Sequence, residues 1–192
     1  MVFSPFYNII RKEGVKRLFI AILFDDPVID QLSCGMASLK QQSMQGNFTR
    51  PENLHLTLAF LGETNQVEKA KRAINAISFP SFSLLMNRLG YFERTGGNIY
   101  WVGMAHNPLL SDLHHHLSSS LSEEGFRLEN REYRPHLTLG RQVLLVPQFD
   151  RKKWESEYLP IHTPVAKVSL MKSERIQGKL TYTELFYQMS RE

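Results

Sequence analysis

Cysteine, long apolar runs and an excess of one charge are all scarce in this sequence of 192 residues. The single cysteine, Cys34, cannot form an internal disulfide, which excludes a disulfide-stapled scaffold and indicates a reducing compartment. The longest apolar run, Leu18 to Phe24, is far shorter than the roughly 20 residues needed to span a bilayer. Charged residues interrupt the segment before it, so a secretory signal is not expected. These observations predict a cytoplasmic protein with no membrane-spanning segment.

Glycine and proline number only 11 and 9, and no linker rich in either divides the chain. Hydrophobic residues make up 42% and charged residues 22%, which is typical of a globular domain and excludes collagen-like and disordered chains. The net charge of +4 is too small to indicate nucleic-acid binding by itself. We expect an N-terminal extension at residues 1–16, whose role is open, and a single domain at residues 17–192.

Strands and helices alternate along the chain, which predicts an α+β fold. Strand-like runs lie at residues 17–24, 54–61, 82–85, 89–92, 99–104, 133–140, 165–172 and 180–188. Helical spacing of apolar residues follows Asp26-Pro27, Thr64 and Asn107-Pro108, and Gly125 is expected to end the third helix. Residues 41–53 are predicted to form a loop, and residues 142–164 are predicted to be irregular.

One short motif occurs twice. The sequence His-Leu-Thr-Leu begins at His55 and again at His136, 81 residues further on. Each copy lies on a predicted strand after a polar loop that contains proline and arginine. Two copies in a chain of this length indicate two lobes of similar build, related by a pseudo-twofold axis.

Side chains alternate across a strand, so the histidine and threonine of each motif point one way and the two leucines point the other. The leucines can then anchor the core while two imidazoles and two hydroxyls, from His55, Thr57, His136 and Thr138, face a common cleft. This set suits a phosphate, because hydroxyls donate hydrogen bonds to its oxygens. A histidine pKa of about 6.5 populates both the acid and the base form near neutrality.

A single His-x-Thr on a strand is most often structural, since histidine commonly pairs with a neighbouring threonine. The second copy, at an equivalent place in the other half of the chain, favours the catalytic interpretation. No carboxylate cluster at metal-ligand spacing accompanies either motif, so we expect no metal site and no cofactor.

The motifs and their surroundings resemble the 2H phosphoesterases, in particular the branch of RNA 2′,3′-cyclic phosphodiesterases, also called 2′-5′ RNA ligases. The similarity covers nearly the whole chain after Lys16. It includes Arg17-Leu-Phe-Ile-Ala-Ile22, Pro51-Glu-Asn-Leu-His-Leu-Thr-Leu-Ala-Phe-Leu-Gly62, Trp101-Val-Gly103, Tyr133-Arg-Pro-His-Leu-Thr-Leu-Gly-Arg141 and Val168-Ser-Leu-Met-Lys-Ser-Glu174.

The resemblance implies a bilobal fold, with two pseudo-symmetric lobes of antiparallel sheet and outer helices around a central cleft. It also implies metal-independent hydrolysis of a 2′,3′-cyclic phosphate to a 2′-phosphomonoester. By motif position, His55 would be the proton donor to the departing 3′-oxygen and His136 the proton acceptor that activates water. Thr57 and Thr138 would hold the phosphate, and Arg141 would stabilise the charge of the transition state. The two motifs are too alike for the residues alone to assign donor and acceptor.

Other candidates carry weaker signals. Arg134 lies on the same strand face as His136 and is either a phosphate or RNA-backbone contact or a solvated side chain. Phe48 and Tyr133 either stack on a base or pack in the core, and Arg50 lies in a loop that could line the cleft. Three consecutive histidines, 114–116, point about 100° apart on a helix and cannot converge on one metal ion. Cys34 is expected near the core side of its helix and is not expected to be a catalytic thiol.

Three functions fit these residues. The first is hydrolysis of RNA 2′,3′-cyclic phosphate ends or of cyclic nucleotides by a monomer. The second is 2′-5′ ligation at the same site, with the 5′-hydroxyl of a second RNA in place of water. The third is a non-catalytic nucleotide-binding or RNA-binding module, which would have little need for two proton-transfer groups.

Overall fold

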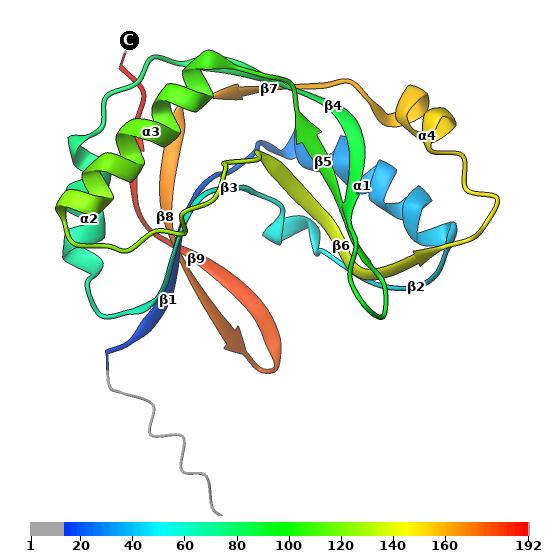
Figure 1. The fold of residues 1–192 in the computed structure, drawn as a ribbon, viewed down its shortest axis with the longest axis horizontal. Coiled ribbons are helices and arrows are strands. Elements are labelled where there is room, and N and C mark those ends of the chain that lie inside the picture. The colour runs from blue at the N-terminus through cyan, green and yellow to red at the C-terminus, as the bar shows by residue number, and fades with distance from the viewer. Residues whose placement is uncertain (1–13, 192) are drawn as a thin grey trace, which may run out of the picture.

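The computed structural model describes residues 14–191, which form two antiparallel β-sheets (Figure 1). The expected extension at residues 1–16 therefore lies mostly outside the described residues, and the first strand begins at Lys16. Sheet A has the order β3-β1-β8-β9 and sheet B the order β2-β6-β5-β4-β7. The strands are β1 (Lys16–Ile22), β2 (Ser43–Phe48), β3 (Leu56–Thr64), β4 (Phe82–Phe92), β5 (Asn98–Met104), β6 (His136–Leu145), β7 (Ile161–Val165), β8 (Lys167–Ile176) and β9 (Lys179–Met189).

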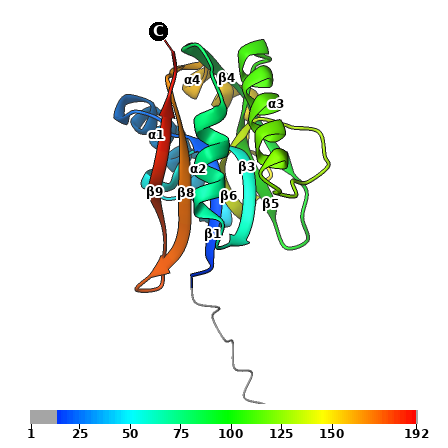
Figure 2. The same cartoon turned by 90° about the vertical axis from the view of Figure 1, so that its left-hand side faces the viewer.

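Each sheet carries helices on one face. Helices α2 (Val67–Ala76) and α3 (Pro108–Glu123) pack against each other and cover sheet A (Figure 2). Helices α1 (Asp26–Gln41) and α4 (Arg151–Tyr158) cover sheet B. The expected two-lobed α+β architecture is confirmed, and the face of each sheet that the helices leave uncovered carries one motif.

The helix ends follow from local side-chain chemistry. Asp25 caps α1 by accepting a hydrogen bond from the backbone N–H of Val28 at 3.3 Å, so the cap is one residue earlier than the expected Asp26. Asn107 caps α3 in the same way, accepting from the N–H of Leu110 at 3.0 Å. Gly125 follows α3 with a φ of +87°, a conformation that glycine adopts without strain.

Two segments differ from the predicted loops. Residues 41–53 contain β2 and a short 3-10 helix at Pro51–Asn53. Strand β2 was missed because it is a polar, largely exposed edge strand whose sequence lacks the alternation of a half-buried strand. Residues 142–164 contain the end of β6, all of α4 and most of β7. Helix α4 was missed because Trp154 is its one buried residue, so it has no apolar stripe.

The strand at 82–92 is continuous, although two separate strands were predicted there. The pairing of β4 with β5 shifts register between Met86 and Arg88. This irregularity interrupts the apolar alternation in the sequence, but the strand continues through it. The predicted final hairpin is confirmed, since β8 and β9 pair along their whole length and turn at Gly178.

One buried hydrophobic cluster runs through both lobes. The leucines of both motifs belong to it, and Leu56, Leu58, Leu137 and Leu139 are each no more than 3% exposed. Burying a leucine side chain contributes about 2 kcal/mol to folding, so these residues fix the motif strands firmly. No helix in the described part of the chain is long and apolar enough to cross a membrane.

Candidate active site

The first motif holds its histidine in a defined ring orientation. The Nδ1 atom of His55 lies 2.8 Å from the carbonyl oxygen of Asn53, and its Nε2 atom lies 3.0 Å from the Thr57 hydroxyl. Because a carbonyl only accepts, Nδ1 carries a proton and Nε2 is the atom that gains or loses one. His55 and Thr57 share one face, as strand alternation predicts.

The second motif repeats this arrangement. The Nδ1 atom of His136 lies 2.7 Å from the carbonyl oxygen of Arg134, again two residues earlier in the chain. Nε2 of His136 is therefore also the titrating atom. The motifs differ in one respect, because within residues 14–191 no hydrogen bond joins His136 to Thr138.

The two motif strands belong to different sheets, so they are not neighbours within one sheet. Strand β3 is an edge strand of sheet A, whereas β6 lies inside sheet B. They approach each other where the sheets meet, and the Tyr133 hydroxyl, just before β6, donates a hydrogen bond to the carbonyl oxygen of Thr57 at 3.2 Å. This bond links the two motifs directly.

Burial is the main influence on both imidazoles. It lowers the pKa of His55 and of His136 below the usual value of 6.5, and the carbonyl that accepts from each Nδ1 partly offsets this. The charge of Arg141 lowers the pKa of both rings, and His136 itself lowers the pKa of His55. The two histidines and Arg141 thus lie within electrostatic range of one another.

Strand β6 is irregular around Arg141, an exposed residue. His136, Thr138 and Gly140 would share one face of a regular strand, and Arg141 would point to the other. The pairing of β6 with β5 shifts register after Gly140, and Gln142 has a φ of +54°. An extra residue at a bulge re-aims the neighbouring side chains. Sequence alternation alone does not foresee this placement.

The other predicted arginines have partners. Arg134 is exposed and forms an ion pair with Glu132 at 2.9 Å, so its side chain faces solvent while its carbonyl oxygen orients His136. Arg50 forms an ion pair with Glu52 at 3.1 Å and donates to the carbonyl oxygen of Leu180.

The amide of buried Asn53 donates to the same Leu180 oxygen at 3.1 Å. The carbonyl oxygen of Asn53 accepts from Nδ1 of His55, so the C-terminal hairpin helps to position the first histidine.

Aromatic rings beside each histidine were missed at the level of sequence. Phe19 and Tyr182 lie 4.8 and 5.2 Å from the His55 ring centre. Phe92 and Trp101 lie 5.1 and 6.0 Å from that of His136. These rings come from β1, β9, β4 and β5, so no sequence spacing relates them to the motifs. They supply much of the surface that buries the imidazoles.

The remaining sequence candidates have structural surroundings. His114 stacks on Tyr133 with ring centres 3.8 Å apart, so Tyr133 packs in the protein. Phe48 is partly buried against the core. Among the described residues no three histidine, cysteine, aspartate or glutamate side chains are placed to hold a metal ion. Cys34 is exposed, so the expectation that it lies near the core side is wrong. The buried residues of α1 nearest to it in sequence are Leu32, Gly35 and Met36, and Cys34 itself is not among the buried ones.

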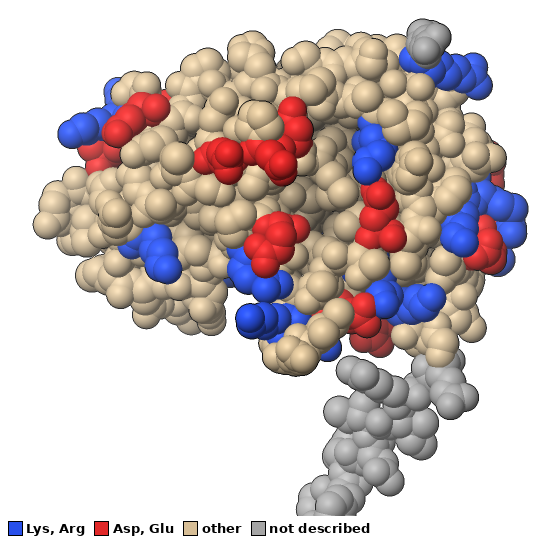
Figure 3. Space-filling model, turned by 180° about the vertical axis from the view of Figure 1, so that it is seen from behind, with Lys and Arg blue, Asp and Glu red and all other residues tan. Residues whose placement is uncertain are grey.

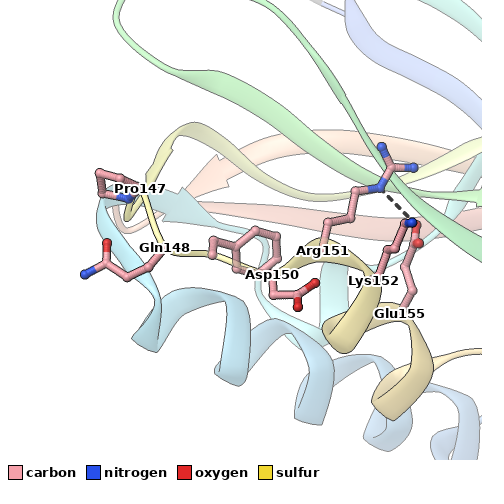
Figure 4. A pocket seen from close by; sticks show the side chains of 7 residues that line it. Pro147, Gln148, Asp150, Arg151, Lys152 and Glu155 are labelled. Carbon is pink, nitrogen blue, oxygen red and sulfur yellow. Dashed lines mark hydrogen bonds and ion pairs between the residues drawn. The ribbon is translucent and has the colours of Figure 1, made fainter.

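Two surface features lie apart from the paired motifs. Basic and acidic side chains are interspersed over the face shown in Figure 3. Figure 4 shows a hollow at the start of α4, where Arg151 and Glu155 form an ion pair at 3.1 Å. None of the residues that line this hollow belongs to the paired motifs.

The chain resembles known proteins along most of its length. A model of the 2′-5′ RNA ligase superfamily matches residues 25–177. The RNA 2′,3′-cyclic phosphodiesterase of Thermotoga maritima is 32% identical over 178 residues, covering 90% of this chain and 92% of that protein. The Escherichia coli protein of the same name is 30% identical over 173 residues, covering 88% and 94%. The crystal structure of E. coli LigT complexed with 3′-AMP has a TM-score of 0.76 at 27% identity and covers 93% and 99%.

The similarity to proteins named RNA 2′,3′-cyclic phosphodiesterase over most of the chain makes this protein a phosphoesterase, and hence a hydrolase. The chain belongs to the 2′-5′ RNA ligase superfamily. The resemblance drawn from the motif residues is thereby confirmed.

Proposed function

We propose that this enzyme hydrolyses the 2′,3′-cyclic phosphodiester at RNA ends, or in cyclic nucleotides, to a 2′-phosphomonoester. The observation that carries the proposal is the matched pair of histidines, each with Nδ1 bonded to the carbonyl oxygen two residues earlier. The names of the T. maritima and E. coli relatives and the 3′-AMP bound to LigT support the choice of substrate.

The reaction needs one proton removed and one supplied. In the assignment implied by the family, Nε2 of neutral His136 takes a proton from water as the water oxygen forms a bond to phosphorus. The bond from phosphorus to O3′ breaks, and Nε2 of protonated His55 gives its proton to O3′. The phosphate remains on O2′, and the two histidines have exchanged protonation states.

The other groups hold and stabilise the phosphate. Thr57 and Thr138 donate hydrogen bonds to its non-bridging oxygens, and the Arg141 charge offsets the negative charge that develops on them. We assign Arg134 to contact the RNA backbone, from its exposed place two residues before His136.

The proposal includes a metal-free reaction, because the chain itself supplies both proton-transfer groups and the charge stabilisation. We further propose that residues 17–192 act as one catalytic domain, that the enzyme works as a monomer and that it is cytoplasmic. The lone cysteine supports a reducing compartment.

A second candidate is 2′-5′ ligation, which the name of the matching family model favours. The 5′-hydroxyl of a second RNA would replace water, lose its proton to His136 and form a 2′-5′ phosphodiester. The same residues would act in the same order.

Incubation with adenosine 2′,3′-cyclic phosphate and with a short cyclic-phosphate RNA, in EDTA, tests the proposal directly. ³¹P NMR assigns the position of the phosphate in the product. A 2′-phosphate supports the reaction, and a 3′-phosphate would reverse the assignment of the leaving oxygen. Binding without turnover of either substrate would favour ligation or a binding module.

Chelation should leave the turnover rate unchanged, because every group in the proposed mechanism belongs to the chain. The measurement compares initial rates before and after dialysis against EDTA. A rate that falls on dialysis and returns with zinc or magnesium would contradict the metal-free mechanism.

Replacing Thr57 or Thr138 by valine should weaken phosphate binding by about 10-fold, since each change removes one hydrogen bond to an anionic group. The expected effect is a raised KM for cyclic nucleotide, measured by steady-state kinetics. Thr181→Val is a control, because the Thr181 hydroxyl bonds the carbonyl oxygen of Lys179 in the final hairpin. Unchanged KM values in both motif variants would contradict the assignment of the two threonines to phosphate binding.

A further inference from the structure

Two glycines, Gly90 and Gly103, leave a patch of sheet B beside the second motif without side chains, and we call this patch the glycine floor. Gly90 is paired with Trp101 across β4 and β5, and Gly103 is paired with His136 across β5 and β6. A Cβ atom added at Gly90 would lie 2.2 to 2.6 Å from three atoms of the Trp101 six-membered ring. One added at Gly103 would lie 2.8 Å from the same ring. The indole therefore lies directly over backbone that has no side chains.

The side chain of Arg88 also lies over the glycine floor. A Cβ atom at Gly103 would also lie 2.6 Å from Nε of Arg88, and the Arg88 guanidinium carbon lies 5.6 Å from the centre of the Trp101 ring. Arg88 is exposed, whereas Trp101 is half-buried. The Arg88 guanidinium thus lies over the indole ring, next to His136, whose ring centre is 6.0 Å from that of Trp101.

Core packing does not account for this tryptophan. Its Nε1 atom is buried and has no hydrogen-bond partner among the described residues. A buried indole N–H usually has a partner, as does Trp154, which donates to the carbonyl oxygen of Gly35 at 3.1 Å. The structure therefore keeps Trp101 at this position although its indole N–H has no partner, which indicates a role for the face of its ring.

We propose that Trp101 and Arg88 form a subsite for the nucleobase of the nucleotide that carries the cyclic phosphate, an inference that rests on the proposed function. Bases in RNA complexes stack on aromatic rings and on guanidinium planes. A ring adjacent to His136 is close enough to hold a base whose ribose carries the reacting phosphate. Every base has a stacking face, so the subsite accepts all four and holds purines more tightly.

Tyr182 is the polar aromatic residue beside His55, on sheet A. It meets the rings of His55 and Phe19 edge to face, at interplanar angles of 88° and 69°. These contacts use Tyr182 to pack the first histidine. Trp101 also contacts its motif histidine and a phenylalanine, Phe92, whose ring centre is 5.3 Å away. It differs from Tyr182 in lying over Gly90 and Gly103 and beneath the Arg88 guanidinium, which favours sheet B for the base.

The test compares adenosine 2′,3′-cyclic phosphate with the methyl ribofuranoside 2′,3′-cyclic phosphate, which has no base. Trp101→Leu should lower kcat/KM for the nucleotide about 10-fold or more beyond any loss for the base-free substrate, mainly through KM. Arg88→Gln should act in the same direction by a smaller factor. Tyr91→Ala is the control, since this exposed ring lies on β4 next to Gly90 and on the opposite face. This variant should leave kcat/KM unchanged for both substrates.

A binding measurement covers the case in which Trp101→Leu does not fold. The chain has two tryptophans, and Trp154 is 3% exposed, so a ligand at the proposed subsite changes mainly the emission of Trp101. Adenosine 2′-phosphate should quench the emission of the wild-type enzyme, and the base-free 2′-phosphate should not. Arg88→Gln should weaken the quenching.

If the Trp101 and Arg88 variants lost kcat/KM equally for both substrates, or for neither, the proposed subsite would be overturned. A base-selective loss in Tyr182→Leu with none in the Trp101 and Arg88 variants would also overturn it. If the wild-type enzyme turned over neither substrate, the proposed function would fail, and the quenching titration would still decide the subsite. Quenching by the nucleotide alone would support it, and equal or absent quenching would overturn it.

Discussion

Alanine in place of either His55 or His136 should lower kcat for cyclic nucleotide by about 10²-fold or more, because each change removes one of two proton transfers. In the proposed mechanism the Nε2 atoms of both residues act in the same step, and the carbonyl contacts of Nδ1 orient both rings. The double variant should lose little more than either single one, since one remaining histidine cannot complete the transfer. Steady-state turnover of adenosine 2′,3′-cyclic phosphate measures the effect.

The matched control is His115→Ala, an exposed histidine on α3 outside both motifs. It should retain wild-type turnover. Circular dichroism and thermal unfolding should show that the motif variants are folded, because the leucines that anchor both strands are untouched. Turnover near the wild-type rate in both motif variants would refute the catalytic assignment.

Replacing Arg141 by glutamine should lower kcat by about 10²-fold, the scale on which a single charge-stabilising donor contributes to a transition state. It should also change the pH dependence, because the Arg141 charge lowers the pKa of both histidines. The proposed mechanism requires His55 protonated and His136 neutral. kcat/KM therefore falls as pH rises past the pKa of the acid, and falls as pH drops below the pKa of the base.

In the wild-type enzyme burial and Arg141 lower the pKa of both histidines, so the maximum of kcat/KM should lie below about pH 6.5. Without the arginine charge both pKa values rise, and the maximum moves to higher pH. Arg175→Gln, at the tip of the last hairpin, should leave the profile in place. A profile that kept its position in Arg141→Gln would place this guanidinium too far from the rings to act on them.

The sequence was sufficient to predict the motif residues because their signal is local. Strand alternation places His55 with Thr57 and buries the leucines between and beyond them, and the duplicated motif makes chance coincidence improbable. The cap of α3 is local in the same way, since an asparagine acts on an N–H three residues later, whereas α1 is capped by Asp25, one residue before the predicted Asp26. Such features depend on backbone geometry within one turn or one strand.

The rest of the site depends on contacts between distant segments. The aromatic rings beside the histidines come from distant strands, and Tyr182 and His55 are separated by about two thirds of the chain, so no spacing rule relates them. Arg141 lies at an irregularity of β6 next to Gln142, whose φ is positive, and alternation cannot foresee where its side chain points. Helix α4 has one buried side chain, and its place is set by Trp154 against Gly35 rather than by its own sequence pattern.

Helices α1 and α3 each cross from one sheet to the other. Helix α1 follows β1 of sheet A but packs on sheet B, and α3 follows β5 of sheet B but packs on sheet A. Each lobe thus lacks part of its covering layer until the other is assembled, and sheet A also needs the last two strands of the chain. We expect the lobes to unfold in a single cooperative transition, so that neither half of the chain is an autonomous folding unit. On this expectation, the two histidines come together only when both lobes are assembled.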